Sequence, residues 1–124
     1  MLRYLISFND GAMDHITEKD LPAVGRAAHA VVQEAITAGV FVFGTGIDRQ
    51  RASIVATDGT VTDGPDPEIG DFLGGFVIVD VASREEALAW AAKFAVACRC
   101  AQEVRQLMFD PETDAMLRQA GRQA

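Results

Sequence analysis

The sequence has few cysteines, few positive charges and no long apolar run. Its two cysteines, Cys98 and Cys100, are too close together to staple distant elements and lack the further ligands of a usual zinc site. We expect ordinary intracellular thiols and no metal site. The apolar start, residues 1–8, is too short for a signal peptide, and no segment approaches the roughly 20 apolar residues that span a bilayer. We therefore expect a cytoplasmic protein without a membrane partner.

The charge balance is acidic. Lysine and arginine total 11 against 18 aspartates and glutamates, which gives a formal net charge of −7. An acidic surface repels phosphate backbones, so we expect no nucleic-acid partner. The 124 residues, 49% of them hydrophobic, are enough for one folded domain with its own core. We place that domain at residues 1–110, followed by a C-terminal tail at 111–124.

Apolar periodicity predicts two helices and several strands. The first helix is expected to begin between Thr17 and Asp20, which resemble a capping box, and to end before Gly39. The second helix opens at a capping box formed by Ser83 and Glu86 and runs to about residue 98. Strands are expected at residues 2–8, 40–43, 51–57, 60–62, 75–81 and 101–109.

The order of these elements predicts a ferredoxin-like α+β fold, βαββαβ with a central hairpin and both helices on one sheet face. Gly44 and Gly46 are expected to interrupt the second strand. Apolar residues cover a wide arc of the second helix, including Trp90 and Phe94. Either its many alanines blur the boundary or a second subunit covers Trp90 or Phe94. We expect a homodimer, which would also cover the helix-free sheet face. The polar segment from Asp110 is a loose tail or a short helix.

The segment from Thr62 to Gly75 is expected to be a long loop. It contains the turn signature Asp63-Gly64-Pro65, and loops of this length without apolar periodicity are often functional. Repulsion among its carboxylates, if they were desolvated, would raise at least one pKa toward the range of a general base. A plain surface turn is the competing interpretation. The carboxylates concerned are Asp63, Asp66, Glu68 and Asp71.

The segments Thr62-Asp63-Gly64-Pro65, Leu73-Gly74-Gly75-Phe76, residues 86–92 and Glu103-Val104-Arg105 occur in an order that resembles the YCII-related family, and within it the DGPF branch. The resemblance covers residues 2–109. It implies a dimeric ferredoxin-like fold of the α+β barrel type, found in small cytoplasmic enzymes or ligand binders. Some members occur beside or fused to sigma factors, and the better-described relatives carry a His–Asp pair proposed for acid–base chemistry.

Two residues depart from the family pattern. Asp66 stands where the signature has phenylalanine, and Gly70 stands where a lysine is common. Both changes make the loop more acidic, so an anionic substrate shared with other family members is in doubt. His29 is the natural partner for Asp63, because it lies at the edge of the first helix's apolar stripe, where a carboxylate could move its pKa across neutrality. The competing interpretation is a histidine that only covers the helix edge.

These residues give two main hypotheses, and a structural role for the dimer alone is a third. The leading one is a cofactor-free enzyme in which His29 and Asp63 exchange a proton with an unknown small organic molecule. The alternative is a non-catalytic dimer that holds a small ligand or docks on a regulatory protein such as a sigma factor. Tyr4 could reach the cleft or belong to the core, and Arg105 could receive an anion or pair with a neighbour. The candidate ligand-binding residues are Tyr4, Gly64, Pro65, Phe76 and Arg105.

Overall fold

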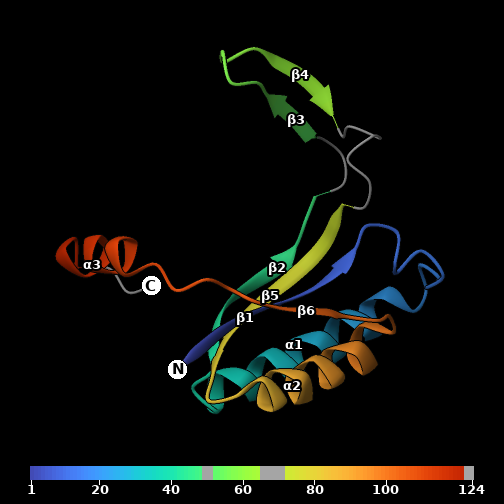
Figure 1. Cartoon of the computed structure of the whole chain (residues 1–124). Helices are drawn as coiled ribbons and strands as arrows, with labels where there is room; N and C mark the ends of the chain where they lie inside the picture. The colour runs from blue at the N-terminus through green and yellow to red at the C-terminus, as the bar shows by residue number, and fades with distance from the viewer. Residues whose placement is uncertain (49–51, 65–71, 122–124) are drawn as a thin grey trace.

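The computed structural model describes residues 1–48, 52–64 and 72–121. Four strands form one antiparallel sheet in the order β2-β5-β1-β6. Two helices cover one face of this sheet and leave the other face without helices (Figure 1). This arrangement is the ferredoxin-like α+β fold, as predicted. The elements are β1 (Leu2–Asn9), α1 (Leu21–Thr37), β2 (Phe41–Gly46), β5 (Leu73–Val81), α2 (Arg84–Cys98) and β6 (Glu103–Gln106).

The core lies between the sheet and the two helices. Tyr4 and Ile6 of β1 are buried on the helix side, and Tyr4 lies opposite Val79 of β5. Burying an aliphatic side chain such as Ile6 or Val79 contributes about 1.5–3 kcal/mol to the stability of the fold. Ala35 of α1 and Ala87 of α2 pack into the same cluster. Their short side chains allow both helix backbones to approach the sheet closely.

The predicted N-cap at Ser83 is confirmed, although Glu86 reaches back to the N–H of Ala82 and not to that of Ser83, so the capping box is only partly formed. The backbone N–H of Glu86 donates to Ser83 Oγ at 3.2 Å, and Glu86 Oε2 accepts from the N–H of Ala82 at 3.0 Å. The helix ends at Cys98, and Arg99 follows it in the left-handed conformation with φ of 57°. Such a residue commonly closes a helix because its N–H can reach a carbonyl of the last turn.

The start of α1 differs from the prediction. Its N-cap is Asp20, whose side chain does not cap the helix, so the capping box at Thr17 is wrong. Residues 17–20 instead form a turn in which the N–H groups of Asp20 and Leu21 donate to the carbonyl of Thr17. The Asp20 carboxylate pairs with Arg99 at 3.4 Å. Gly39 ends the helix with φ of 76°, as predicted.

Phe94 does not need a second subunit to cover it. Its side chain is only 4% exposed and packs against Val31 of α1 and Ala97 of α2. The alternative that a partner covers Phe94 is therefore wrong, because α1 lies against this part of α2. Trp90 is half-buried, and the Lys93 ammonium lies 5.5 Å from its ring centroid.

Strand β2 continues through Gly44 and Gly46 rather than stopping before them. A side chain at position 44 would place its Cβ 2.5 Å from Val77 Cγ1 and 2.6 Å from the carbonyl oxygen of Phe76. Glycine is therefore required because β5 approaches closely. The predicted interruption is wrong for that reason.

Two strands, β3 (Ala52–Val55) and β4 (Val61–Gly64), form a separate antiparallel ribbon. The tight turn at Asp58-Gly59 is as expected: Gly59 has φ of 88° and Asp58 Oδ1 accepts from the N–H of Thr60 at 2.9 Å. Asp63 lies opposite Ser53 in this ribbon.

The predicted loop from Thr62 to Gly75 is therefore wrong at both ends, because cross-strand pairing extends β4 to Gly64 and β5 begins at Leu73. The remaining loop residues singled out by the sequence lie outside the described residues. They are Pro65, Asp66, Glu68, Gly70 and Asp71.

The C-terminal segment contains the short helix α3 (Pro111–Gln119), which was one of the two expected alternatives. Asp110 caps it, since its Oδ1 accepts from the N–H of Thr113 at 3.2 Å. In the described part of the chain, no helix is both long and apolar enough to cross a membrane.

The close contact at Gly44 gives a direct test of the fold. We expect Gly44→Ala to lower the free energy of unfolding by about 1–3 kcal/mol, the usual cost of overpacking. The control is Gly25→Ala on α1, where an added Cβ meets nothing within 4 Å and should raise the free energy of unfolding by about 0.5–1 kcal/mol. Urea unfolding of both variants measures the difference. Equal effects would show that the β2–β5 contact does not require glycine.

Candidate functional site

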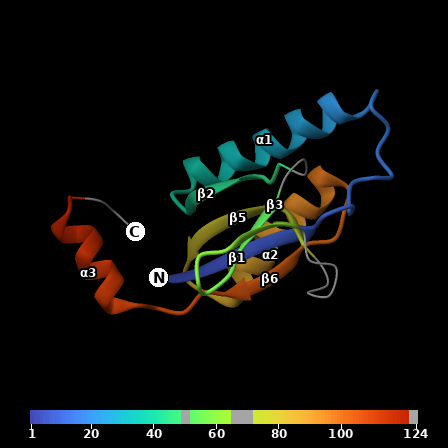
Figure 2. The same cartoon turned by 90° about the horizontal axis from the view of Figure 1, so that it is seen from above.

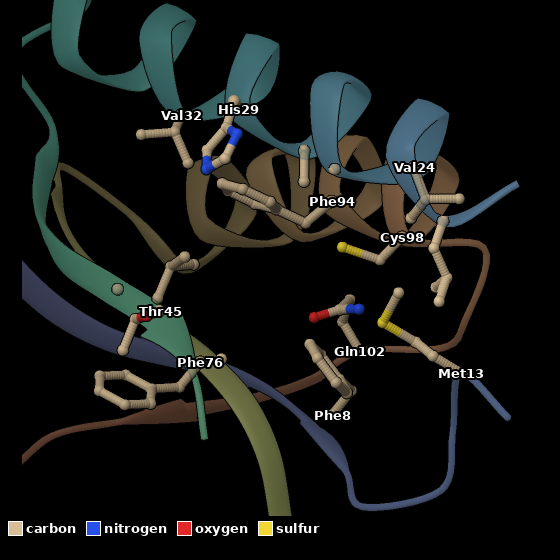
Figure 3. Close-up of a pocket in the computed structure, with 16 residues that line it drawn as sticks. Phe8, Met13, Val24, His29, Val32, Thr45, Phe76, Phe94, Cys98 and Gln102 are labelled. Carbon is tan, nitrogen blue, oxygen red and sulfur yellow. The ribbon is translucent and has the colours of Figure 1, made fainter. Parts of the chain in front are cut away.

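A cavity of about 310 Å³ lies between α1, α2 and one end of the sheet (Figure 3). Its volume is at the lower end of the range of ligand pockets, and most of its lining is apolar. Helix α1 supplies one wall, and strands β2 and β5 contribute to the wall facing it. The lining residues are Phe8, Met13, Leu21, Val24, Gly25, Ala28, His29, Val32, Gly44, Thr45, Gly46, Phe76, Val77, Phe94, Cys98 and Gln102.

Small residues leave this space open. Gly25 and Ala28 line it from α1, and Gly44 and Gly46 line it from β2. A Cβ at Gly25 would meet no atom within 4 Å, and one at Gly46 would only just reach the carbonyl oxygen of Gly74 at 4.0 Å. Missing side chains at Gly25 and Gly46, on two facing elements, therefore leave the cavity open, whereas Gly44 is required by the close contact with β5.

Two ion pairs connect the α1 region to the α2 region. Lys93 Nζ lies 2.9 Å from Glu34 Oε1, and Arg99 Nη1 lies 3.4 Å from Asp20 Oδ2. All four side chains are about half exposed, so each pair contributes well under 1 kcal/mol. Their main effect is on the position of α1 relative to α2, because one pair lies at the start of α1 and the other toward its end.

His29 is the side chain in this cavity best suited to proton exchange. Its imidazole extends from α1 toward the ring of Phe94 (Figure 3). Within the described ranges, neither ring nitrogen has a hydrogen-bond partner. A neutral imidazole has one nitrogen that donates and one that accepts, so it can take a proton from a ligand and return it.

Gln102 adds a second polar group. Its Nε2 donates to the carbonyl oxygen of Cys100 at 3.3 Å and contacts the Cys100 sulfur at 3.5 Å. These contacts engage the nitrogen end of the amide. The amide oxygen faces the cavity interior (Figure 3), where it can accept a hydrogen bond from a ligand.

The thiol of Cys98 is not suited to nucleophilic chemistry. Burial raises its pKa to about 11, with a smaller contribution from the charge of Cys100. The reactive form of cysteine is the thiolate, which is scarce near neutral pH at such a pKa. Among the described lining residues there is no aspartate, glutamate, lysine or arginine, so the cavity has no fixed charge at neutral pH when His29 is neutral.

One chain does not bring His29 and Asp63 together. Asp63 is exposed on the β3–β4 ribbon, which lies on the helix-free side of the sheet, whereas α1 lies on the opposite side (Figure 1). Asp63 is not among the cavity-lining residues of the described chain. Gly64 lies in the same ribbon, and Pro65 lies outside the described residues.

The other candidate residues are divided between the core, the open sheet face and the cavity. Tyr4 is buried in the core, and its hydroxyl donates to Gln106 Oε1 at 3.4 Å. Arg105 pairs with Glu103 on the sheet face away from the helices. Phe76 lines the cavity, although its ring lies beyond β5 from His29 (Figure 3).

Sequence reasoning missed Gln102, Met13 and Phe8 as cavity residues. Gln102 lies in the short connection between α2 and β6, where a polar residue has no distinguishing pattern. Phe8 was recognised only as part of an alternating strand. The one available signal was the pair Gly44 and Gly46, since glycine in a strand can mark the close approach of a ligand or backbone.

The Cys98 thiol gives a prediction for this site. In a Cys100→Ser variant, we expect iodoacetamide at pH 8 to alkylate native Cys98 roughly 100-fold more slowly than the unfolded chain, because far less thiolate is present. Folding raises the pKa of the Cys98 thiol from 9.0 to about 11. The neutral thiol therefore contributes fully to the free energy of unfolding below pH 9, and this contribution is lost as the pH rises from 9 to about 11. Mass spectrometry of quenched samples measures the rate. Rapid alkylation of the folded protein would contradict the prediction.

Comparisons with known proteins show what the chain is similar to. A family model described as the YCII-related domain matches residues 5–108. A solved structure of 5-chloro-2-hydroxyhydroquinone dehydrochlorinase from Burkholderia phenoliruptrix, in complex with 2,5-dihydroxybenzoquinone, has a TM-score of 0.48 and 14% sequence identity. The alignment covers 90% of this chain and 98% of that one. No curated protein matches significantly.

Proposed function

The chain belongs to the YCII-related domain family, and we propose that its cavity binds a small neutral organic molecule with which His29 exchanges a proton. The observation that carries this proposal is the imidazole of His29, an exposed residue that lines a mostly apolar cavity with no other ionisable group than cysteine among its described lining residues. Imidazole is the side chain best suited to accept and donate a proton near neutral pH.

The size of the cavity limits the ligand. A volume of about 310 Å³, at the lower end of the range of ligand pockets, suits a small molecule. Phe8 and Phe94 offer aromatic surfaces to such a molecule. A compact or planar ring system matches this space.

The absence of charge from the described lining limits the ligand further. A carboxylate or phosphate would lose its hydration without meeting a lysine or arginine, which is costly. A neutral hydroxyl can instead donate to His29 or to the Gln102 oxygen. We therefore assign the ligand to neutral molecules with a weakly acidic hydroxyl, such as a phenol or an enol.

The proposed chemistry is a proton transfer. A ring nitrogen of His29 takes the proton from the ligand hydroxyl, giving an imidazolium ion beside an enolate or phenolate. Return of the proton to the same oxygen completes an exchange, and its return to a carbon of the same anion completes an isomerisation. Both routes conserve atoms and electrons, and neither uses a cofactor.

Asp63 has no role in this proposal within a single chain. A carboxylate that bonds to the other ring nitrogen would fix the tautomer of His29 and stabilise its charged form. Strand β4, which contains Asp63, lies on the far side of the sheet from α1 (Figure 1). A His–Asp pair would therefore require Asp63 from another subunit.

A second candidate function is binding without turnover. The observation that favours it is the lack of a carboxylate among the described lining residues, which leaves the imidazole without a group to orient it. In this case the chain would hold a ligand, or dock on a regulatory protein such as a sigma factor, without consuming the ligand. Chemical analysis of the ligand after incubation distinguishes the two functions.

Thermal unfolding in the presence of phenol, 2-naphthol or benzoate tests the ligand class. We expect the two neutral phenols to raise the melting temperature and benzoate to have no effect at equal concentration. His29→Asn should weaken phenol binding by about three- to tenfold, the usual worth of one hydrogen bond. His15→Asn, which changes a histidine outside the cavity lining, is the matched control.

Three results bear on this proposal. Preferential binding of benzoate, or unchanged phenol affinity in His29→Asn, would contradict it. If Asp63→Asn lowers turnover of an identified substrate as much as His29→Asn does, the acid–base pair forms across subunits. Binding without any turnover favours the second candidate function.

Filling the cavity separates its binding role from its contribution to stability. We expect Gly25→Leu to abolish binding of 2-naphthol, because the new side chain enters open space in the cavity. Stability should not fall, since leucine is a better helix former than glycine. Ala27→Leu, at an exposed position of the same helix, is the control. Fluorescence titration with 2-naphthol measures affinity, and retained binding in Gly25→Leu would place the ligand elsewhere.

A further inference from the structure

The cavity that contains His29 has an exposed side and a buried side. Seen from above, α1 runs along β2, the edge strand of the sheet, whereas α2 lies behind β1 and β6 (Figure 2). His29 of α1 and Thr45 of β2 are exposed, while Phe94 and Cys98 of α2 are buried. A ligand that enters between α1 and β2 therefore passes His29 first and ends against α2.

Gln102 is the polar residue at the inner end of this path. It is half-buried in the connection between α2 and β6. Figure 3 shows it across the cavity from His29, with Phe94 and Cys98 between them in this view. The two groups thus contact different ends of a bound molecule.

Cys100 fixes which end of the Gln102 amide faces the ligand. The amide nitrogen of Gln102 donates to the carbonyl oxygen of Cys100 at 3.3 Å and contacts its sulfur at 3.5 Å. A rotated amide would instead place its oxygen against that carbonyl oxygen. The Cys100 N–H cannot compensate, because it already donates to the carbonyl of Ala95 at 3.3 Å. The amide oxygen is therefore the end presented to the cavity.

This oxygen needs a hydrogen-bond donor from the ligand. Among the described residues, no group donates to it. The neighbouring Cys98 thiol is only a weak hydrogen-bonding group. A ligand that covers an acceptor without pairing with it incurs the full desolvation cost of that acceptor. A site with such a group discriminates strongly against analogues that lack the matching donor.

We propose, on the premise of the function proposed above, that Gln102 selects ligands carrying a second hydrogen-bond donor. This N–H or O–H group binds the amide oxygen of Gln102 at the inner end, while the hydroxyl of the same molecule meets His29 near the exposed side. Gln102 is then a specificity-determining residue, and Cys100 is the residue that positions it. Neutral, compact hydroxyindoles have the required pair of donors.

Fluorescence titration of the full chain with matched ligands tests the proposal. The ligands are 5- and 6-hydroxyindole and the corresponding hydroxybenzofurans, in which a ring oxygen replaces the N–H and the hydroxyl stays in place. We expect at least one hydroxyindole to bind about three- to tenfold more tightly than its benzofuran. In Gln102→Met this affinity ratio should fall to about one. Gln33→Met, at an exposed position of α1 outside the cavity lining, is the control and should keep the ratio.

Variants of Cys100 test its positioning role. We expect Cys100→Ala to lower the affinity ratio about twofold, the lower limit of what one hydrogen bond contributes. Cys100→Ser should restore the ratio, because its hydroxyl can accept from the Gln102 amide nitrogen. A purely structural effect would weaken the hydroxyindole and the benzofuran equally and leave their ratio unchanged. An unchanged ratio in Cys100→Ala would overturn the positioning role.

His29→Asn separates this proposal from the proposed function. It should weaken both ligands of a pair by the same factor. If 2-naphthol binding depends on His29 but hydroxyindoles and benzofurans bind equally well, the selection by Gln102 is wrong and the proposed function stands. If no hydroxylated ligand binds the wild type, both are wrong. A ratio retained in Gln102→Met overturns the role of Gln102. Circular dichroism verifies folding, and Gln102→Leu replaces Gln102→Met if the methionine variant unfolds.

Discussion

The packing of α1 against α2 is the contact on which the rest of the structure depends. The two helices meet through Val31, Phe94 and Ala97, with an ion pair toward each end of α1. Near its C-terminal end α1 also reaches the sheet through Ala35. Its N-terminal half is held by α2 instead, above the glycines of β2. The cavity therefore depends on a helix that is fixed mainly by its neighbour.

This arrangement gives the two sheet faces different roles. The helix-covered face supplies stability at one end, where Tyr4, Ile6 and Val79 are buried, and a cavity at the other. The helix-free face carries apolar residues between compensated charges and has no covering element in the described chain. The core and the cavity thus share one face of a small sheet, and the other face contributes to neither.

Local signals in the sequence predicted much of the fold. Alternation identified β1, and the Ser83 capping box located α2, because both depend on nearby residues. Predictions failed where long-range contacts decided the structure. Cross-strand pairing drew Asp63 into β4, and packing against α1 covered Phe94. His29 was found from its position at a helix edge, whereas Gln102 lines the cavity only because β6 returns beside α2, and no local pattern encodes that return.

Phe76 connects the cavity to the helix-free face of the sheet. It lines the cavity and also lies beside Phe43, with the two ring centroids 6.3 Å apart. The contact between these rings restrains β5 at the point where the strand borders the cavity. Strand β4, which carries Asp63, and helix α1 lie on opposite sides of the sheet (Figure 1), and no carboxylate stands among the described lining residues. Within the described part of one chain, proton transfer in the cavity would therefore rest on the imidazole of His29 alone.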